Sequence, residues 1–259
     1  MVNEGDGVVV SDDGRRLRPV RSLLRALDVL EGLVHSKRPL AVGEIATRTG
    51  LSRTAAYNIL TTYEIRGLVR RDSQNRYMPG WGLFELGQHV RSESTLSDAA
   101  RPVVEELADR TGETVLLGVL DQESVIYVEK AESRRSIRMV EAPGHRLPLH
   151  ESATGLVLLA HASQAFRDRY SSRVDSPSSL DDVTRQIRTQ GYAISVQAPD
   201  PDLTSAPLPV SDAHGEPIAA LTVAGPASRL TRARIEEFLP RFLAGAAAIS
   251  KALAGRIVP

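Results

Sequence analysis

The stretch "GLSRTAAYNIL" at residues 50–60 joins the end of one helical segment to the beginning of another. Gly50 follows the segment "AVGEIATRT", and glycine readily takes the left-handed conformation that ends many helices. Ser52 stands at the N-cap position of the next segment, where its hydroxyl oxygen can accept a backbone N–H. The spacing of Ala56 and Leu60 predicts a helix that begins here, with both side chains facing a core.

Two more helices and a hairpin flank this stretch. Residues 20–35 place apolar side chains at i, i+3, i+4 and i+7, beginning at Leu23, which predicts an amphipathic helix. A short helix is expected at 41–50, and Gly67 closes the helix that begins after Ser52. The runs 68–71 and 75–78 flank a polar turn and predict a β-hairpin. This order of elements is that of a winged helix-turn-helix, which is a DNA-binding module.

The charges of the chain are distributed unevenly along the sequence. Residues 15–82 contain 13 Lys and Arg against 5 Asp and Glu, although the whole chain has a net charge of zero. Residues 1–14 and 83–259 each carry a net charge of −4. A basic first third joined to a mildly acidic remainder favours a nucleic-acid-binding module that is attached to a second domain.

The third helix of such a module enters the major groove of double-stranded DNA. Arginine can pair bidentately with guanine and asparagine with adenine, whereas hydroxyl groups commonly contact phosphates. Arginines of the hairpin are placed to reach the DNA backbone or a minor groove. The expected DNA-contacting residues are Ser52, Arg53, Thr54, Tyr57, Asn58 and Thr61 on the helix, and Arg70, Arg71 and Arg76 on the hairpin.

The rest of the chain alternates helical and strand-like segments, which indicates an α/β domain. Residues 97–112 predict an amphipathic helix, and 113–133 predict two strands around a turn. Residues 135–150 predict a strand, a loop and a short strand. Later helices are expected at 152–163, 179–191 and 231–255, and later strands at 192–197, 203–212 and 217–225. Ser152 and Ser179 are the expected N-caps, and Pro240 is expected to kink the last helix or to begin it afresh.

Several classes of function are excluded or disfavoured. The chain has no cysteine, so disulfides, thiolate zinc sites and cysteine nucleophiles are absent. The apolar run at 156–160 is too short to span a bilayer, and the first residues do not form a signal peptide, so we expect a cytoplasmic protein without a membrane partner. His145 and His150 are the only plausible catalytic pair. Because HExxH, GxSxG, GxGxxG and Walker patterns are missing, we expect no enzyme activity, no metal and no cofactor.

Several segments resemble the IclR-type transcriptional regulators. The first runs from Leu23 to Gly80, and the others are "HRLPLHESATGLVLLA", "GYAISVQ" and "GEPIAALTVAGPASRLT". The resemblance implies an α+β chain in which a linker helix joins the winged helix-turn-helix to a GAF-like α/β effector-binding domain. It also implies dimerisation through the DNA-binding half, dimers of dimers, and roughly palindromic operators.

The expected parts are a disordered leader at 1–17, the winged helix-turn-helix at 18–80, the linker helix at 81–96 and the GAF-like effector-binding and oligomerisation domain at 97–257. The function implied is that of a DNA-binding regulator whose operator binding is modulated by a small-molecule metabolite. The alternatives are a ligand-binding module of the same fold without specific DNA binding, and an enzyme that uses the C-terminal pocket.

The resemblance also implies an effector pocket formed by a loop and by the following strands. The matching residues are Ser152, Ala153, Thr154 and Gly155 in the loop, and Ser195, Ser205, Thr222 and Ala224 in the strands. The family often carries an arginine at Asn58, a lysine at Leu156, an acid at Ser195 and a cysteine at Ser205. Because hydroxyl groups stand where acids are usual, we expect an effector larger or less charged than a small 2-oxo acid.

Overall fold

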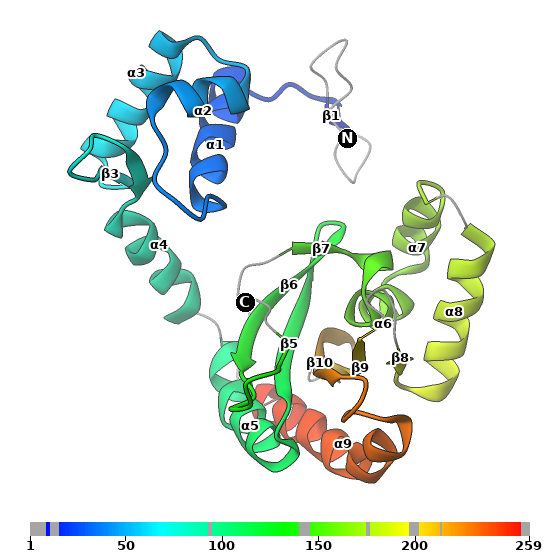
Figure 1. Ribbon diagram of the computed structural model, residues 1–259. Coiled ribbons are helices and arrows are strands. Elements are labelled where there is room, and N and C mark those ends of the chain that lie inside the picture. Colours follow the sequence, from blue (N-terminus) through cyan, green and yellow to red (C-terminus); the bar gives the residue numbers. More distant parts are fainter. Residues whose placement is uncertain are drawn as a thin grey trace. The chain divides into compact units, whose positions relative to one another are not determined.

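The computed structural model describes residues 9–10, 16–92, 95–139, 146–174, 177–196, 202–212 and 214–254. The chain folds as two compact units, Met1–Glu93 and Ser94–Pro259 (Figure 1). Among the described residues, no helix is both long enough and apolar enough to cross a membrane.

The first unit contains the helices of a winged helix-turn-helix and a small antiparallel sheet. The helices are α1 (Arg21–Val34), α2 (Val42–Thr49), α3 (Arg53–Ile65) and α4 (Trp81–Ser92). Strand β3 (Val69–Arg71) pairs with β4 (Tyr77–Pro79) to form the wing. The hydrophobic core of the first unit consists of Val29, Leu33, Leu40, Ile45, Leu60, Val69 and Tyr77. The fold expected from the sequence is confirmed for this unit.

The turn between α2 and α3 forms as the opening stretch predicts. Gly50 has a φ of 65° and caps α2 in the left-handed conformation. The backbone N–H of Leu51 donates to the Ala46 carbonyl at 3.0 Å. The Ser52 hydroxyl accepts from the backbone N–H of Ala55 at 3.1 Å and so caps α3. Local chemistry alone therefore explains how the chain changes direction before α3.

The expected leader contains a short pair of strands. Strand β1 (Val9–Val10) pairs with β2 (Arg16–Leu17) in antiparallel register. Valine has a high β propensity, and the absence of helical or strand periodicity in the leader gave no indication of this pairing. Residues 1–8 and 11–15 lie outside the described residues.

The second unit is built on one antiparallel sheet. Its strands lie in the order β7-β6-β5-β10-β9-β8. Their bounds are β5 (Thr114–Asp121), β6 (Ser124–Ala131), β7 (Arg146–Pro148), β8 (Ser195–Val196), β9 (Leu203–Ser211) and β10 (Pro217–Pro226).

Helices cover both faces of this sheet (Figure 1). The helices are α5 (Thr95–Thr111), α6 (Ala153–His161), α7 (Gln164–Ser171), α8 (Pro177–Gln190) and α9 (Arg232–Ala254), with a 3-10 turn at Leu149–Glu151. Leu221 and Val223 of β10 pack in the core beneath α5 and α9, whereas Ala220 and Ala224 pack in the core beneath α6. Because both faces are covered, β10 carries apolar residues toward both faces instead of alternating apolar with polar ones, and Thr222 is its one polar side chain.

Two expectations for this unit were wrong. Residues 135–139 form no strand, although their apolar and polar side chains alternate; Ile137 is 72% exposed, and β7 occupies the edge beside β6. Ser179 is not an N-cap, because α8 already begins at Pro177. Proline favours the first turn of a helix, which the choice of Ser179 overlooked.

Helix boundaries show three further differences. The helix at 81–96 ends at Ser92, and a separate helix begins at Thr95. Helix α7 was not expected, although Ser163 caps it by accepting from the Phe166 N–H at 3.3 Å. Helix α9 runs through Pro240, so it does not begin afresh there, and Phe238 and Phe242 are buried in the core on either side of the proline.

Candidate DNA interface and effector pocket

The outer face of α3 carries most of the expected DNA-contacting side chains. Ser52, Arg53, Thr54, Tyr57 and Asn58 are all exposed, whereas α3 buries only Ala56 and Leu60. The structure therefore brings these polar groups together on one surface at the N-terminal half of the helix. The helix N-terminus adds partial positive charge there, which favours an anion such as phosphate.

Thr61 differs from the other side chains expected on this face. It is half-buried, and its hydroxyl oxygen is buried without a hydrogen-bond partner among the described residues. The next residue, Thr62, is exposed and donates its hydroxyl hydrogen to the Asn58 carbonyl at 2.9 Å. Thr61 thus lies at the edge of the core and not on the open polar surface.

The three arginines of the wing have different surroundings. Arg70 is exposed, its Nε donates to the Pro79 carbonyl at 3.3 Å, and its guanidinium lies 6.0 Å from the Trp81 ring centroid. Arg71 forms an ion pair with Glu64, and Arg76 forms one with Asp72. Within the described part of the chain, Arg53 and Arg70 have no carboxylate partner, so their charges are available to an external anion.

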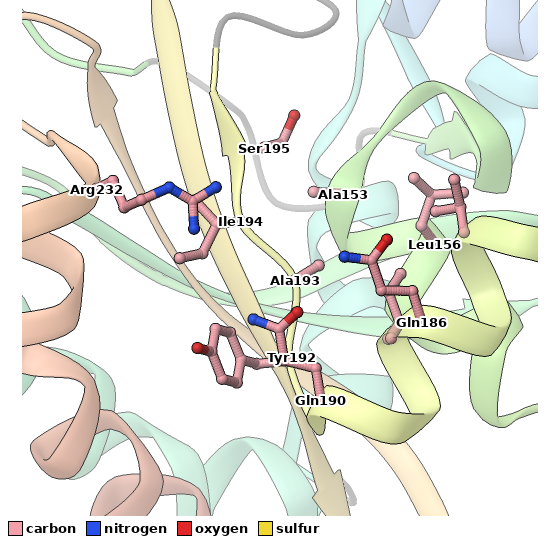
Figure 2. Close-up of a pocket in the computed structure, with 11 residues that line it drawn as sticks. Ala153, Leu156, Gln186, Gln190, Tyr192, Ala193, Ile194, Ser195 and Arg232 are labelled. Atoms are coloured by element: carbon pink, nitrogen blue, oxygen red, sulfur yellow. The ribbon is translucent and has the colours of Figure 1, made fainter.

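The second unit contains a pocket of about 200 Å³ between α6, α8 and the segment that leads into β8. Figure 2 shows the Arg232 guanidinium on one side of the pocket and the Gln186 and Gln190 amides on the other. Its lining residues are Ala153, Leu156, Val183, Gln186, Ile187, Gln190, Tyr192, Ala193, Ile194, Ser195 and Arg232. The lining is mostly apolar with a few polar groups, as is usual for small-molecule sites.

Of the eight residues expected to bind an effector, Ala153 and Ser195 line this pocket. Ser152 instead caps α6, because its hydroxyl accepts from the Gly155 N–H at 3.0 Å. Gly155 allows a close backbone approach: a Cβ there would lie 2.3 Å from the Leu149 carbonyl oxygen. These two residues shape the start of α6 and do not line the pocket.

The hydroxyl groups on α6 and β10 that were expected to bind the effector are hydrogen-bonded to each other. Thr154 and Thr222 are buried, and their hydroxyl oxygens lie 2.9 Å apart. The Tyr127 hydroxyl donates to the Thr154 hydroxyl at 3.2 Å. Ser205 and Ala224, which are register partners on β9 and β10, are also buried. In this structure, none of these residues lines the pocket.

Sequence reasoning missed the polar residues that do line the pocket. Gln186 and Gln190 lie on α8 beside the inward-facing Val183 and Ile187, and this helical spacing could have suggested them. Arg232 begins α9 and gave no sequence signal, because its position depends on packing between segments far apart in the chain.

Of the two histidines expected as a catalytic pair, His150 lies among the described residues. His150 Nδ1 lies 2.7 Å from the hydroxyl oxygen of buried Tyr170, which anchors the loop before α6. Burial raises the pKa of Tyr170, so this phenol stays protonated at neutral pH. His145 lies outside the described residues. Nowhere in the described ranges do three or more His, Cys, Asp or Glu gather as metal ligands would.

A winged helix-turn-helix with an open polar α3, followed by an α/β unit with a small pocket, defines a DNA-binding protein with a second, pocket-containing domain. Residues 22–73 match the IclR helix-turn-helix domain, and residues 88–251 match the C-terminal domain of the bacterial transcriptional regulator IclR. The chain therefore belongs to the IclR family of transcriptional regulators. The family and the relatives below are regulators, so this chain is a DNA-binding regulator and not an enzyme.

Individual relatives resemble the chain over nearly its whole length. It is 32% identical over 248 residues to the HTH-type transcriptional regulator BhcR of Paracoccus denitrificans, covering 92% of this chain and 88% of that protein. It is 28% identical over 249 residues to the transcriptional repressor IclR of Escherichia coli, covering 91% of each. The crystal structure of Thermotoga maritima IclR superposes with a TM-score of 0.74 at 29% identity, covering 90% of this chain and 99% of that chain.

Proposed function

We propose that this regulator binds an operator through α3 and that a small molecule in the α6–α8 pocket changes its affinity for that operator. The observation that carries the proposal is the exposed polar face of α3, where Arg53 and Asn58 have the chemistry to pair with guanine and adenine. The basic charge of residues 15–82 supports attraction to DNA. As a bacterial DNA-binding protein, it is expected in the cytoplasm.

The test is binding to the DNA upstream of its own gene, measured by fluorescence anisotropy against an unrelated duplex at several salt concentrations. We expect preference for the upstream DNA and an affinity that falls as salt rises. Equal binding to both duplexes would contradict operator recognition. No binding to either would favour the alternative, a ligand-binding module of the same fold without specific DNA binding.

The charges that line the pocket suggest the chemistry of the effector. Arg232 supplies a positive charge, it forms no ion pair within the described residues, and no Asp or Glu is among the lining residues. The two glutamine amides can donate and accept hydrogen bonds. We therefore propose a small anionic effector in place of the larger or less charged one suggested by Thr154 and Thr222, whose hydroxyl groups are occupied with each other.

Calorimetry with a panel of small carboxylates and their uncharged amides tests this chemistry. We expect carboxylates to bind and their amides to bind at least tenfold more weakly, since the amide loses its attraction to Arg232. Arg232→Ala should remove the preference, whereas Arg234→Ala should not, because Arg234 pairs with Glu237 outside the pocket. We expect the Arg232→Ala protein to bind each carboxylate and its amide with equal affinity. An unchanged preference for the carboxylate would reject an anionic effector held by Arg232.

Linkage between the two sites is part of the proposal. If the effector changes operator affinity, the operator must change effector affinity by the same factor. Titrating the effector with and without a saturating operator fragment measures this factor. The same effector affinity in both titrations would show that the pocket does not control DNA binding.

The apolar surface of the first unit supports a homodimer. Exposed apolar side chains lie at the N-cap of α1 and along that helix, namely Val20, Leu23, Leu27 and Val34, and two more, Trp81 and Phe84, lie at the start of α4. Exposed apolar patches of this kind commonly mark protein interfaces. A dimer would present two copies of α3 to a palindromic operator, and pairing of dimers would give a tetramer. Sedimentation velocity should show that Leu23→Glu with Leu27→Glu shifts the protein toward smaller species; an unchanged distribution would argue against this surface.

A further inference from the structure

Arg71 of the wing is enclosed by groups of its own domain. Its Nη2 donates to Glu64 Oε2 at 2.7 Å, and its guanidinium lies 4.9 Å from the centroid of the Tyr77 ring. The Arg71 side chain is only 30% exposed, and its Nε is buried without a partner among the described residues. An arginine held between a carboxylate and an aromatic ring has few donors left for an external phosphate.

The partners of Arg71 connect three parts of the domain. Glu64 lies on the last turn of α3, and Tyr77 lies on β4, the strand that pairs with the strand of Arg71. The pKa of Arg71 is raised, mainly by its hydrogen bond to Glu64. Arg71 therefore remains charged and links the wing to the last turn of α3.

The opposite side of the wing is also anchored. Tyr77 is buried, and it exchanges two backbone hydrogen bonds with Leu40: Leu40 N donates to Tyr77 O at 2.9 Å, and Tyr77 N donates to Leu40 O at 2.7 Å. Neighbouring residues on a strand point to opposite faces, so Arg70 faces outward where Arg71 faces α3. The wing thus presents Arg70 from a support that Arg71 and Tyr77 hold in place.

We propose that Arg71 is a positioning residue and not a phosphate contact: with Glu64 it fixes the angle between the wing and α3, so that Arg70 and the exposed face of α3 meet DNA as one surface. This inference rests on the proposed operator binding. It assigns Glu64, an acid next to a DNA-binding surface, a favourable role in DNA binding.

The direction in which Glu64→Ala changes DNA affinity distinguishes a phosphate-binding role of Arg71 from a positioning role. If Arg71 bound phosphate, Glu64 would compete for it, and Glu64→Ala would tighten DNA binding. If Arg71 positions the wing, Glu64→Ala and Arg71→Ala should weaken binding to a similar extent. The double variant should then be no weaker than either single variant, because both changes break one interaction.

The experiment measures operator affinity of the full-length protein over a salt series for Arg71→Ala, Glu64→Ala, the double variant and the matched control Arg70→Ala. For Arg70→Ala we expect the slope of log K against log salt to fall by about 1, as for a lost phosphate contact. For Arg71→Ala and Glu64→Ala we expect roughly 3- to 10-fold weaker binding with an unchanged slope, as for broken hydrogen-bonded ion pairs. Tighter binding by Glu64→Ala, or a slope that falls by about 1 in Arg71→Ala, would overturn the proposal.

Hydrogen exchange of the free protein gives a readout that does not depend on DNA. We expect faster amide exchange across residues 69–79 in Arg71→Ala and Glu64→Ala, but not in Arg70→Ala. Exchange as slow as in the unchanged protein would refute the positioning role. If the unchanged protein binds no DNA, operator binding fails as a proposal, and hydrogen exchange still decides whether Arg71 holds the wing.

Discussion

Helices α3 and α6 begin with the same type of N-cap, but α3 is largely exposed and α6 is largely buried. Ser52 caps α3 and Ser152 caps α6, each by accepting the backbone N–H three residues ahead. Yet α3 buries two of its 13 residues, whereas α6 buries seven of its nine. The same capping chemistry therefore presents polar groups to a partner in one helix and packs a helix into a core in the other.

This difference explains why the two sets of expected site residues lie in different surroundings. A residue on α3 needs only the correct helical face to be exposed, and periodicity gives that face. A residue on α6 faces the sheet or another helix, so its neighbours decide whether it reaches a ligand. Thr154 meets Thr222 and Tyr127 instead of the pocket.

The largest expected effect comes from disturbing the close packing at the start of α6. Gly155→Ala places a Cβ 2.3 Å from the Leu149 carbonyl oxygen and 2.6 Å from its Cα, so the backbone must move. We expect a loss of about 3 kcal/mol in the free energy of unfolding, from overpacking. Urea unfolding measures it. The control is Gly43→Ala on α2, where nothing lies within 4 Å of an added Cβ; equal stability of the two variants would show that α6 can shift freely.

The exposed face of α3 should respond in binding and not in stability. Arg53→Ala should weaken binding to the operator by about 1–3 kcal/mol if this side chain pairs with a base, and it should relax sequence preference at one position. The melting temperature should remain nearly the same, because Arg53 is exposed. Competition anisotropy with operators changed at single base pairs measures the effect. As a control, Arg110→Ala removes an exposed charge from the second unit. An Arg53→Ala protein that keeps full sequence preference would remove Arg53 from the interface.

A smaller effect tests whether the buried hydroxyl pair binds a ligand. Thr222→Val removes one hydroxyl, and Thr154 keeps the Tyr127 hydroxyl as a partner, so we expect a loss of about 1 kcal/mol in stability. Effector affinity should stay within a factor of two, because Thr222 does not line the pocket. Isothermal calorimetry measures the affinity. A loss of tenfold or more would return Thr222 to the effector site.

The smallest effect concerns the exposed cap of α2. Glu44 accepts from the Ala41 N–H at 2.8 Å, and its ion pair with Arg38 at 2.5 Å is the main cause that lowers the pKa of Glu44 to about 2. A lowered folded-state pKa contributes stability that is present above the unfolded value of 4.5 and is lost as pH falls toward 2. Both groups are exposed, so salt should weaken the effect.

Glu44→Gln should therefore lower the melting temperature slightly at neutral pH, and the difference from the unchanged protein should shrink as the pH falls below 4.5. Scanning calorimetry over a pH series measures both values. A difference that stays constant down to the lowest pH at which both proteins fold would show that the Glu44 charge contributes nothing.

The wing is a local element whose strands could be predicted from the sequence but whose side-chain contacts could not. The hairpin and its arginines could be read from turn residues and from spacing, and β3 and β4 lie within two residues of their expected places. That Arg71 and Arg76 are paired with Glu64 and Asp72 depends on side-chain contacts that no local pattern encodes. The strand expected at 135–139 shows the same limit: alternation permits a strand, but a strand also needs a neighbouring strand with which to pair, and these residues pair with none of the described strands.

Sequence alone determined the winged helix-turn-helix, the exposed face of α3, the α/β nature of the second unit and the membership of a regulator family. Each depends on local periodicity, capping, charge or ordered motifs. Only the tertiary structure decided that Ala153 and Ser195 meet Gln186, Gln190 and Arg232 around one pocket, and that Thr154 and Thr222 bond to each other. The physical reason is that a pocket is lined by segments distant in sequence, whose side-chain directions depend on packing between helices and sheet.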